Sequence, residues 1–322
     1  MELNNGRREA IQLFPPIKKK TYQPVSIGGR RMSEIKNISV IGAGQMGHQI
    51  AMLCALGGYE TVIQDLQDEA LAKAKEKLEA IMARWVQKGK ISEEEAAKAF
   101  HRLRFTASLE EAAAGADLII EAVVEKIEIK RDVFSKLDKL ASPHAIFATN
   151  SSTIVNSLLA DVTDRPDKFI NMHFFFPPLV MDCVEVVKSQ KTSEETSQAA
   201  MDVCRRINRT AFLLHKEVSG FVANRILGAL QKEAVYLYEQ GIADFKDIDS
   251  ICRKALGHPI GPFELMDLSG IDVGYFVMEQ RYKETGNPED KPYSCLEEKM
   301  KKGELGRKTG KGWYDYEGQG VK

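Results

Sequence analysis

The chain has 322 residues, a length that suits two domains of about 100–200 residues each. Hydrophobic residues make up 43% and charged residues 28%, which excludes wholesale disorder, a collagen-like repeat and a coiled-coil rod. Lys and Arg number 45 against 46 Asp and Glu, so no basic excess marks a nucleic-acid-binding surface, and no apolar run reaches the roughly 18–20 residues of a membrane span.

The five cysteines are scattered and odd in number, and none of them forms a C-x-x-C pair. In a chain of this size that pattern predicts reduced thiols in a cytoplasmic compartment, without a disulfide frame or a metal site. The residues concerned are Cys54, Cys183, Cys204, Cys252 and Cys295.

Residues 1–31 carry many basic and few acidic side chains, unlike the rest of the chain. They lack the apolar stretch of about 7–15 residues that a secretory signal needs. We interpret them as a flexible N-terminal extension, with Met32 as a second candidate start. A targeting segment or an oligomer arm is the alternative, although several prolines disfavour a long amphipathic helix.

A glycine-rich turn follows the first predicted strand, residues 37–41. A predicted helix over 48–56 and a second strand over 61–63 come next. Strand, glycine turn, helix and strand in this order are typical of a dinucleotide-binding unit, whereas the glycine pattern alone is weak evidence. The sequence therefore predicts a nucleotide site at the start of the fold.

The residues of this turn have separate predicted roles. Gly42 permits the tight bend, Gly44 lets backbone N–H groups approach a pyrophosphate, and Gly47 lets the helix pack close to the strand. Asp65, 18 residues after Gly47, is placed to accept ribose hydroxyls and to repel a 2′-phosphate, which favours NAD over NADP. The predicted cofactor-binding residues here are Gly42, Gly44, Gln45, Met46, Gly47 and Asp65.

Strand and helix patterns continue to alternate beyond this unit. A capping box at Ser92 opens one of the helices. The alternation predicts an α/β fold with a doubly wound, Rossmann-type sheet. The predicted helices cover residues 69–88 and 127–140, and the predicted strands cover 117–124, 145–148, 168–173 and 183–187.

Strand signals nearly vanish after Ser219. Helical periodicity replaces them over residues 220–240, 248–256, 262–268 and 272–282. We therefore predict an all-helical C-terminal domain after the sheet domain. The predicted divisions are 1–31, 32–216 and 217–322.

Four polar residues, Asn150, Ser152, His173 and Glu185, lie at or beyond predicted strand ends, where doubly wound sheets bind ligands. A carboxylate in an apolar strand needs a partner, and a histidine donating Nδ1–H to Glu185 would satisfy it. The same contact would aim Nε2 at a substrate as a base. The alternative is a core histidine at His173 beside a solvated Glu185.

The helical half offers two weaker candidates. Asn224 lies one turn into the helix over 220–240, where its amide could bond a substrate oxygen or could simply cap and pack the helix. The loop 308–312 is basic and glycine-rich, a pattern more typical of solvated surface than of a site.

Seven stretches of this chain, in order, resemble the L-3-hydroxyacyl-CoA dehydrogenase family, including its short-chain 3-hydroxybutyryl-CoA members. The resemblance covers about residues 35–316. The stretches are VIGAGQMG (40–47), EAVVEKIEIK (121–130), TNSST (149–153), HFFFPPLVMDCVEVV (173–187), GFVANRIL (220–227), GPFELMDLSGID (261–272) and GRKTGKGWYDY (306–316).

Carried onto matching positions, the resemblance implies His173 as the catalytic base and Glu185 as its partner. Ser152 and Asn224 match residues that contact the substrate oxygen, and Lys88 matches a basic residue that approaches the CoA phosphates. The residues implied to line the NAD site are Asp65, Glu125, Lys130 and Lys308, with Asn150 beside them.

Three positions depart from the family pattern. Phe176 stands where the family usually has an Asn that contacts the cofactor, so one amide contact is lost or replaced. Asp182 stands where a Lys is common, and Ile81 lies near the place of a CoA-contacting Ser in some members.

The resemblance implies NAD-dependent, reversible oxidation of an L-3-hydroxyacyl-CoA to the 3-ketoacyl-CoA, as in fatty-acid β-oxidation or butanoate metabolism. It also implies a homodimer formed through the helical domain. Two alternatives stay open: a related NAD-dependent dehydrogenase of a small hydroxy or sugar acid, and an NAD-binding protein without catalysis.

Overall fold

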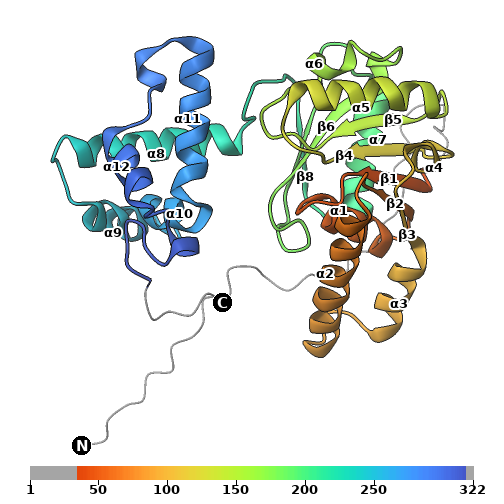
Figure 1. The fold of residues 1–322 in the computed structure, drawn as a ribbon, viewed down its shortest axis with the longest axis horizontal. Helices are drawn as coiled ribbons and strands as arrows, with labels where there is room; N and C mark the ends of the chain where they lie inside the picture. Colours follow the sequence, from red (N-terminus) through yellow and green to blue (C-terminus); the bar gives the residue numbers. More distant parts are fainter. Residues whose placement is uncertain (1–34, 317–322) are drawn as a thin grey trace, which may run out of the picture. The chain divides into compact units, whose positions relative to one another are not determined.

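The computed structural model describes residues 35–316, and the predicted extension 1–31 lies outside them. Within the described part, the chain divides into two compact units between Phe221 and Val222 (Figure 1). The first unit carries the sheet and its flanking helices. The second unit contains helices, and in the described range its remaining β-structure consists of isolated bridges.

The first unit contains an eight-stranded sheet in the order β3-β2-β1-β4-β5-β6-β7-β8. All neighbouring strands run parallel except β6 and β7, which are antiparallel. Because the strand order reverses between β1 and β4, ligands are expected beyond the carboxyl ends of these strands. The strands are β1 Asn37–Ile41, β2 Glu60–Gln64, β3 Leu103–Thr106, β4 Leu118–Glu121, β5 Ile146–Thr149, β6 Phe169–Phe174, β7 Val184–Val187 and β8 Ala211–Leu214.

Helices cover both faces of this sheet, because its central strands are apolar on both sides. Leu118 and Ile120 pack toward α1, α2, α3 and α7, whereas Ile119 packs toward α4, α5 and α6. The neighbouring helices α2 and α3 extend away from the sheet (Figure 1). The helices are α1 Gly47–Leu56, α2 Asp68–Gln87, α3 Glu93–Arg102, α4 Leu109–Ala113, α5 Ile127–Leu140, α6 Ser157–Ala160 and α7 Glu194–Arg206.

The helical unit packs around an aromatic core. The Phe263 and Trp313 rings meet at 4.5 Å, and Tyr238 and Phe245 close the cluster. Buried Asp267 accepts the backbone N–H groups of Trp313 and of the next residue, which holds this segment against α10. The helices are α8 Ala223–Glu239, α9 Phe245–Ala255, α10 Pro262–Ser269, α11 Ile271–Thr285 and α12 Ser294–Lys302.

The predicted α/β class, with a Rossmann-type sheet before a helical region, is confirmed. Four element boundaries were wrong by three residues: α9 begins earlier than the predicted helix 248–256, α11 ends later than the predicted helix 272–282, and the other two have a local cause. The predicted strand 117–124 ends at Glu121, because the next residues turn and the Val123 N–H bonds to the Glu121 carboxylate. The helix predicted from residue 220 begins at Ala223, because Gly220 and Phe221 have positive φ angles of 77° and 46°.

No helix within residues 35–316 is both long and apolar enough to span a bilayer. The same residues contain no group of three or more His, Cys, Asp and Glu side chains suited to hold a metal ion. All five cysteines are free thiols.

Candidate active site

His173 and Glu185 face each other across the antiparallel strands β6 and β7. Directly opposed residues in such a pair project from the same face of the sheet, so their side chains meet. His173 Nδ1 lies 2.9 Å from Glu185 Oε2, and the two side chains are 4% and 5% exposed. Neutral imidazole that donates Nδ1–H here keeps its lone pair on Nε2. Nε2 has no hydrogen-bond partner among the described residues.

Two aromatic rings hold the His173 imidazole in place. Phe175 lies 4.6 Å and Phe221 5.4 Å from it, measured between ring centroids. Phe221 is fully buried although it adopts a positive φ. The ring orientation of His173 is therefore fixed by packing as well as by Glu185.

The segment 150–153 follows the carboxyl end of β5. Asn150 Oδ1 accepts the Phe174 N–H at 3.0 Å, which ties this segment to the end of β6. Glu125 Oε1 accepts the Ser152 N–H at 3.2 Å. The Ser152 hydroxyl has no hydrogen-bond partner among the described residues, so it is available to a ligand.

The glycine turn fits a dinucleotide pyrophosphate. A Cβ on Gly42 would lie 2.7 Å from the Ala122 carbonyl oxygen, and one on Gly47 would lie 1.8 Å from the Gly42 oxygen. A Cβ on Gly44 would meet nothing within 4 Å, so this glycine serves no packing need of the chain. Its bare backbone leaves open space before the N-terminus of α1, where an anion is favourable.

The remaining residues of the turn surround this space. Gln45 is exposed and Met46 is half-buried at the N-cap of α1. Asp65, at the end of β2, is half-buried, and its Oδ2 accepts the Ala43 N–H at 2.8 Å. The acid predicted to bind ribose thus lies directly against the glycine turn.

A buried ionic cluster lies beside segment 150–153. Lys130 Nζ lies 2.7 Å from Glu121 Oε1 and 3.1 Å from Glu125 Oε2. Burial raises the pKa of Glu121, an effect that Lys130 and Thr149 oppose. Burial also acts on Glu125, but Lys130 and the hydroxyls of segment 151–153 outweigh it and hold the pKa of Glu125 below its usual range.

Sequence reasoning named Glu125 and Lys130 but missed Glu121 and Thr149 as members of this cluster. The available signal was a glutamate ending the apolar run DLIIE and a lysine nine residues later. A charge at the end of a buried strand requires a partner within reach.

The other predicted residues lie on other elements. Lys88 caps the C-terminus of α2 and is exposed. Asn224 is exposed in the first turn of α8, and Lys308 Nζ lies 2.6 Å from the Asp272 carboxylate, both within the helical unit. Phe176, in the loop after His173, is 57% exposed.

Comparison with known families explains this arrangement. The model of the 3-hydroxyacyl-CoA dehydrogenase NAD-binding domain matches residues 37–218, and that of the 3-hydroxyacyl-CoA dehydrogenase C-terminal domain matches residues 220–316. The chain belongs to the 3-hydroxyacyl-CoA dehydrogenase family. The predicted NAD cofactor and the predicted oxidoreductase class are thereby confirmed.

Individual relatives agree with this assignment. A probable 3-hydroxybutyryl-CoA dehydrogenase of Bacillus subtilis is 38% identical and covers 88% of this chain and 98% of its own length. The crystal structure of the (S)-3-hydroxybutyryl-CoA dehydrogenase of Ralstonia eutropha is 35% identical, covers 88% of this chain and 99% of its own, and superposes with a TM-score of 0.82. A diketoreductase structure, described as acting on dicarbonyl compounds, is 36% identical, covers 88% and 100%, and has a TM-score of 0.81.

Proposed function

We propose that this protein catalyses the reversible oxidation of an L-3-hydroxyacyl-CoA, with 3-hydroxybutyryl-CoA as a candidate, to the 3-ketoacyl-CoA. The observation that carries the proposal is the buried His173–Glu185 pair at the carboxyl end of β6, with Nε2 left for a substrate. This pair lies in the unit that contains the glycine turn. A proton acceptor and a dinucleotide turn in one unit suit the oxidation of an alcohol.

In this proposal His173 Nε2 takes the proton of the 3-hydroxyl group. The Glu185 carboxylate stabilises the imidazolium that results, since it lies 2.9 Å from Nδ1 in a site from which water is largely excluded. The NAD nicotinamide, when bound, supplies the hydride chemistry. General acid–base catalysis of this kind typically contributes about 10²–10⁴-fold to turnover.

The other predicted residues bind and orient. Ser152 and Asn224 are proposed to hold the reacting oxygen, and Lys88 to approach the CoA phosphates. Restricting the substrate to a reactive orientation removes much of its entropic barrier. The proposed cofactor contacts are Gly42, Gly44, Gln45, Met46, Gly47, Asp65, Glu125, Lys130, Asn150 and Lys308.

A substrate series tests the reaction class. We expect the wild-type protein to oxidise NADH in a series of 3-ketoacyl-CoA substrates of increasing chain length that includes acetoacetyl-CoA. We expect His173→Gln to lower kcat by about 10²–10⁴-fold while NADH still binds. Near-normal turnover of His173→Gln would reject the assignment of the base. A failure to oxidise NADH with every 3-ketoacyl-CoA would reject the reaction.

A second candidate function is NAD-dependent reduction of small carbonyl compounds that carry no CoA. It is favoured by the similarity to the diketoreductase, an enzyme of dicarbonyl compounds. Comparing acetoacetyl-CoA with free acetoacetate as the NADH oxidant separates the two functions. Tight NADH binding with no turnover on either compound would instead support an NAD-binding protein without catalysis.

We further propose that the chain forms a homodimer through its helical region. Exposed apolar side chains on α8 and α11 support this, among them Ile226 at 66% and Phe276 at 54% exposure. Light scattering should give twice the monomer mass, and Phe276→Glu should reduce it.

The free thiols support a cytoplasmic location, and the reaction class would serve β-oxidation or butanoate metabolism.

A further inference from the structure

The ionic cluster of Glu121, Lys130 and Glu125 extends from the core to the surface. The side chains of Lys130 and Glu121 are 1% and 0% exposed, whereas that of Glu125 is 42% exposed. Lys130 therefore fixes two carboxylates, one in the core and one at the surface. Buried ion pairs of this kind add little net stability, so their effect on neighbouring groups matters more.

One arm of the cluster runs through Thr149, the last residue of β5. Its Oγ1 donates to Glu121 Oε2 at 2.7 Å and accepts the Ser151 N–H at 3.1 Å. Thr149 is fully buried, so it reaches a ligand only through the residues that it holds.

The other arm runs through Glu125. Its Oε1 accepts the Ser151 hydroxyl, the Ser152 N–H at 3.2 Å, and the Thr153 N–H and hydroxyl at 3.3 and 3.1 Å. The two arms thus hold every backbone N–H of segment 151–153. The Ser152 hydroxyl is left without a hydrogen-bond partner among the described residues.

We infer that Glu121, Lys130 and Thr149 are positioning residues that fix segment 151–153 so that the Ser152 hydroxyl is presented to the substrate oxygen. Lys130 holds both carboxylates through its ammonium group. Glu121 in turn orients Thr149 by accepting its hydroxyl. The inference rests on the proposed function, in which Ser152 contacts that oxygen. In this inference the buried Lys130 positions the Ser152 hydroxyl indirectly, through Glu125 and Thr149.

Two substitutions of Thr149 separate positioning from simple packing. Thr149→Val keeps the shape and removes the hydroxyl, whereas Thr149→Ser keeps the hydroxyl and removes a methyl group. We expect amide hydrogen exchange of peptides spanning residues 149–156 to quicken about tenfold in Thr149→Val, because the hydroxyl that bonds both Glu121 and the Ser151 N–H is lost. We expect kcat with acetoacetyl-CoA to fall about tenfold for the same reason. We expect Thr149→Ser to resemble the wild type, and the NADH Kd to stay within about twofold in both.

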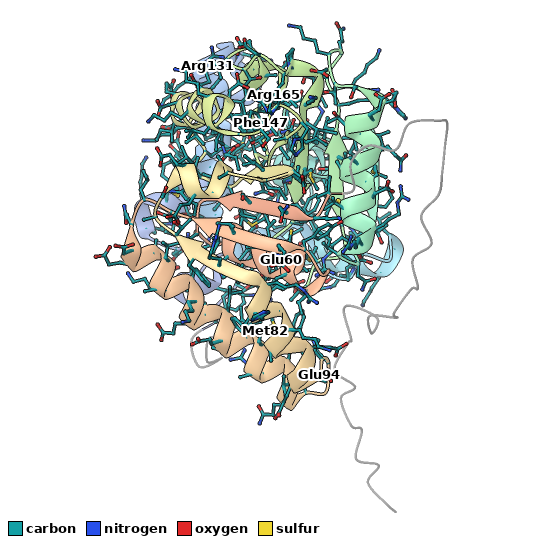
Figure 2. All side chains as sticks on the ribbon, turned by 90° about the vertical axis from the view of Figure 1, so that its right-hand side faces the viewer. Glu60, Met82, Glu94, Arg131, Phe147 and Arg165 are labelled. Atoms are coloured by element: carbon teal, nitrogen blue, oxygen red, sulfur yellow. The ribbon has the colours of Figure 1, made fainter. Side chains whose placement is uncertain are left out.

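A second pair of variants protects the test against misfolding. Lys130→Met alone leaves Glu121 as an unpaired buried charge, but combining it with Glu121→Gln removes both charges. We expect the double variant to fold, with faster exchange in 149–156 and a kcat lowered about tenfold. The matched control is Asp138→Asn, which weakens another ion pair anchored on α5. Asp138 lies 2.7 Å from Arg165, which is labelled in Figure 2, and their side chains are 10% and 11% exposed. That control should lose stability but keep kcat and local exchange.

The outcomes separate the two claims. Exchange and kcat of Thr149→Val equal to those of the wild type overturn the inference, as does a Thr149→Ser variant that loses as much kcat as Thr149→Val. If the wild-type protein reduces no 3-ketoacyl-CoA, the proposed function fails instead. The exchange rates then still decide whether the cluster holds segment 151–153.

Discussion

Replacing Glu185 by Gln tests whether its negative charge assists His173. The Gln oxygen can still accept the Nδ1–H of neutral imidazole, so ring orientation is preserved while the charge is lost. At 2.9 Å, with 4% and 5% exposure, the pair is shielded from solvent screening. A hydrogen bond to a charged group contributes about 1.5–3 kcal/mol. We therefore expect kcat to fall about 10- to 150-fold, because the imidazolium formed during proton transfer loses its counter-charge.

The assay is steady-state NADH oxidation with acetoacetyl-CoA, with the NADH Kd measured by fluorescence. We expect the Kd to be unchanged, since Glu185 lies on β7, separate from the glycine turn that follows β1. Asp138→Asn serves as the control for the loss of a buried carboxylate. A kcat for Glu185→Gln within twofold of the wild type would refute the role of the charge, and an equal loss in Asp138→Asn would show a general effect of destabilisation.

Three further predictions concern the cofactor side. Gly44→Ala should weaken NADH binding about 5- to 150-fold, because its methyl group would crowd the bound dinucleotide. Its unfolding temperature should not change, since the added Cβ meets nothing within 4 Å in the chain. Gly47→Ala should instead lower the unfolding temperature, because its Cβ would lie 1.8 Å from a carbonyl oxygen. Burial, assisted by Lys77, lowers the pKa of His48 below 6.5, against the pull of its bond to the Gly44 carbonyl. The fold thus favours the neutral imidazole of His48, and the stability of the protein should fall as the pH drops below 6.5. His48→Asn keeps a donor for that carbonyl but cannot be protonated. In thermal unfolding this variant should lose less stability than the wild type between about pH 8 and pH 5.5. Phe176→Asn should lower the NADH Kd by about 2- to 10-fold in a fluorescence titration if an amide contact is regained, and an unchanged Kd would count against that contact.

The sequence predicted the first half of the fold well because its signals there are local. The helix over 127–140 matches α5, and the capping box at Ser92 is formed in the structure. Strands β3 and β8 were missed because each has four residues and little burial, and both lie at the edges of the sheet. Edge strands derive their structure from pairing with a neighbour, which no local pattern reports.

The contact between His173 and Glu185 was predicted from the residue types, without the strand register that brings the two side chains together. The sequence placed His173 and Glu185 on two strands but did not specify their register, and a shift of one residue would turn one side chain to the opposite face. The structure supplies that register, with His173 directly opposite Glu185. The Thr149 contact was likewise invisible, because it depends on the parallel pairing of Thr149 with Glu121.

The distribution of buried charge argues that these contacts serve chemistry more than stability. Glu121, Lys130, His173 and Glu185 are all at most 5% exposed, yet each could be replaced by an apolar residue at little cost in stability if its partner were replaced too. All four lie on β4, β6 and β7 or on the helix that follows β4. In the proposed function, burial of the His173–Glu185 pair would strengthen the effect of the Glu185 charge on proton transfer, because preorganised charges stabilise a reacting group most when water is excluded. The expected signature is a set of variants, each with both partners of a pair replaced, that lose kcat while retaining their unfolding temperature.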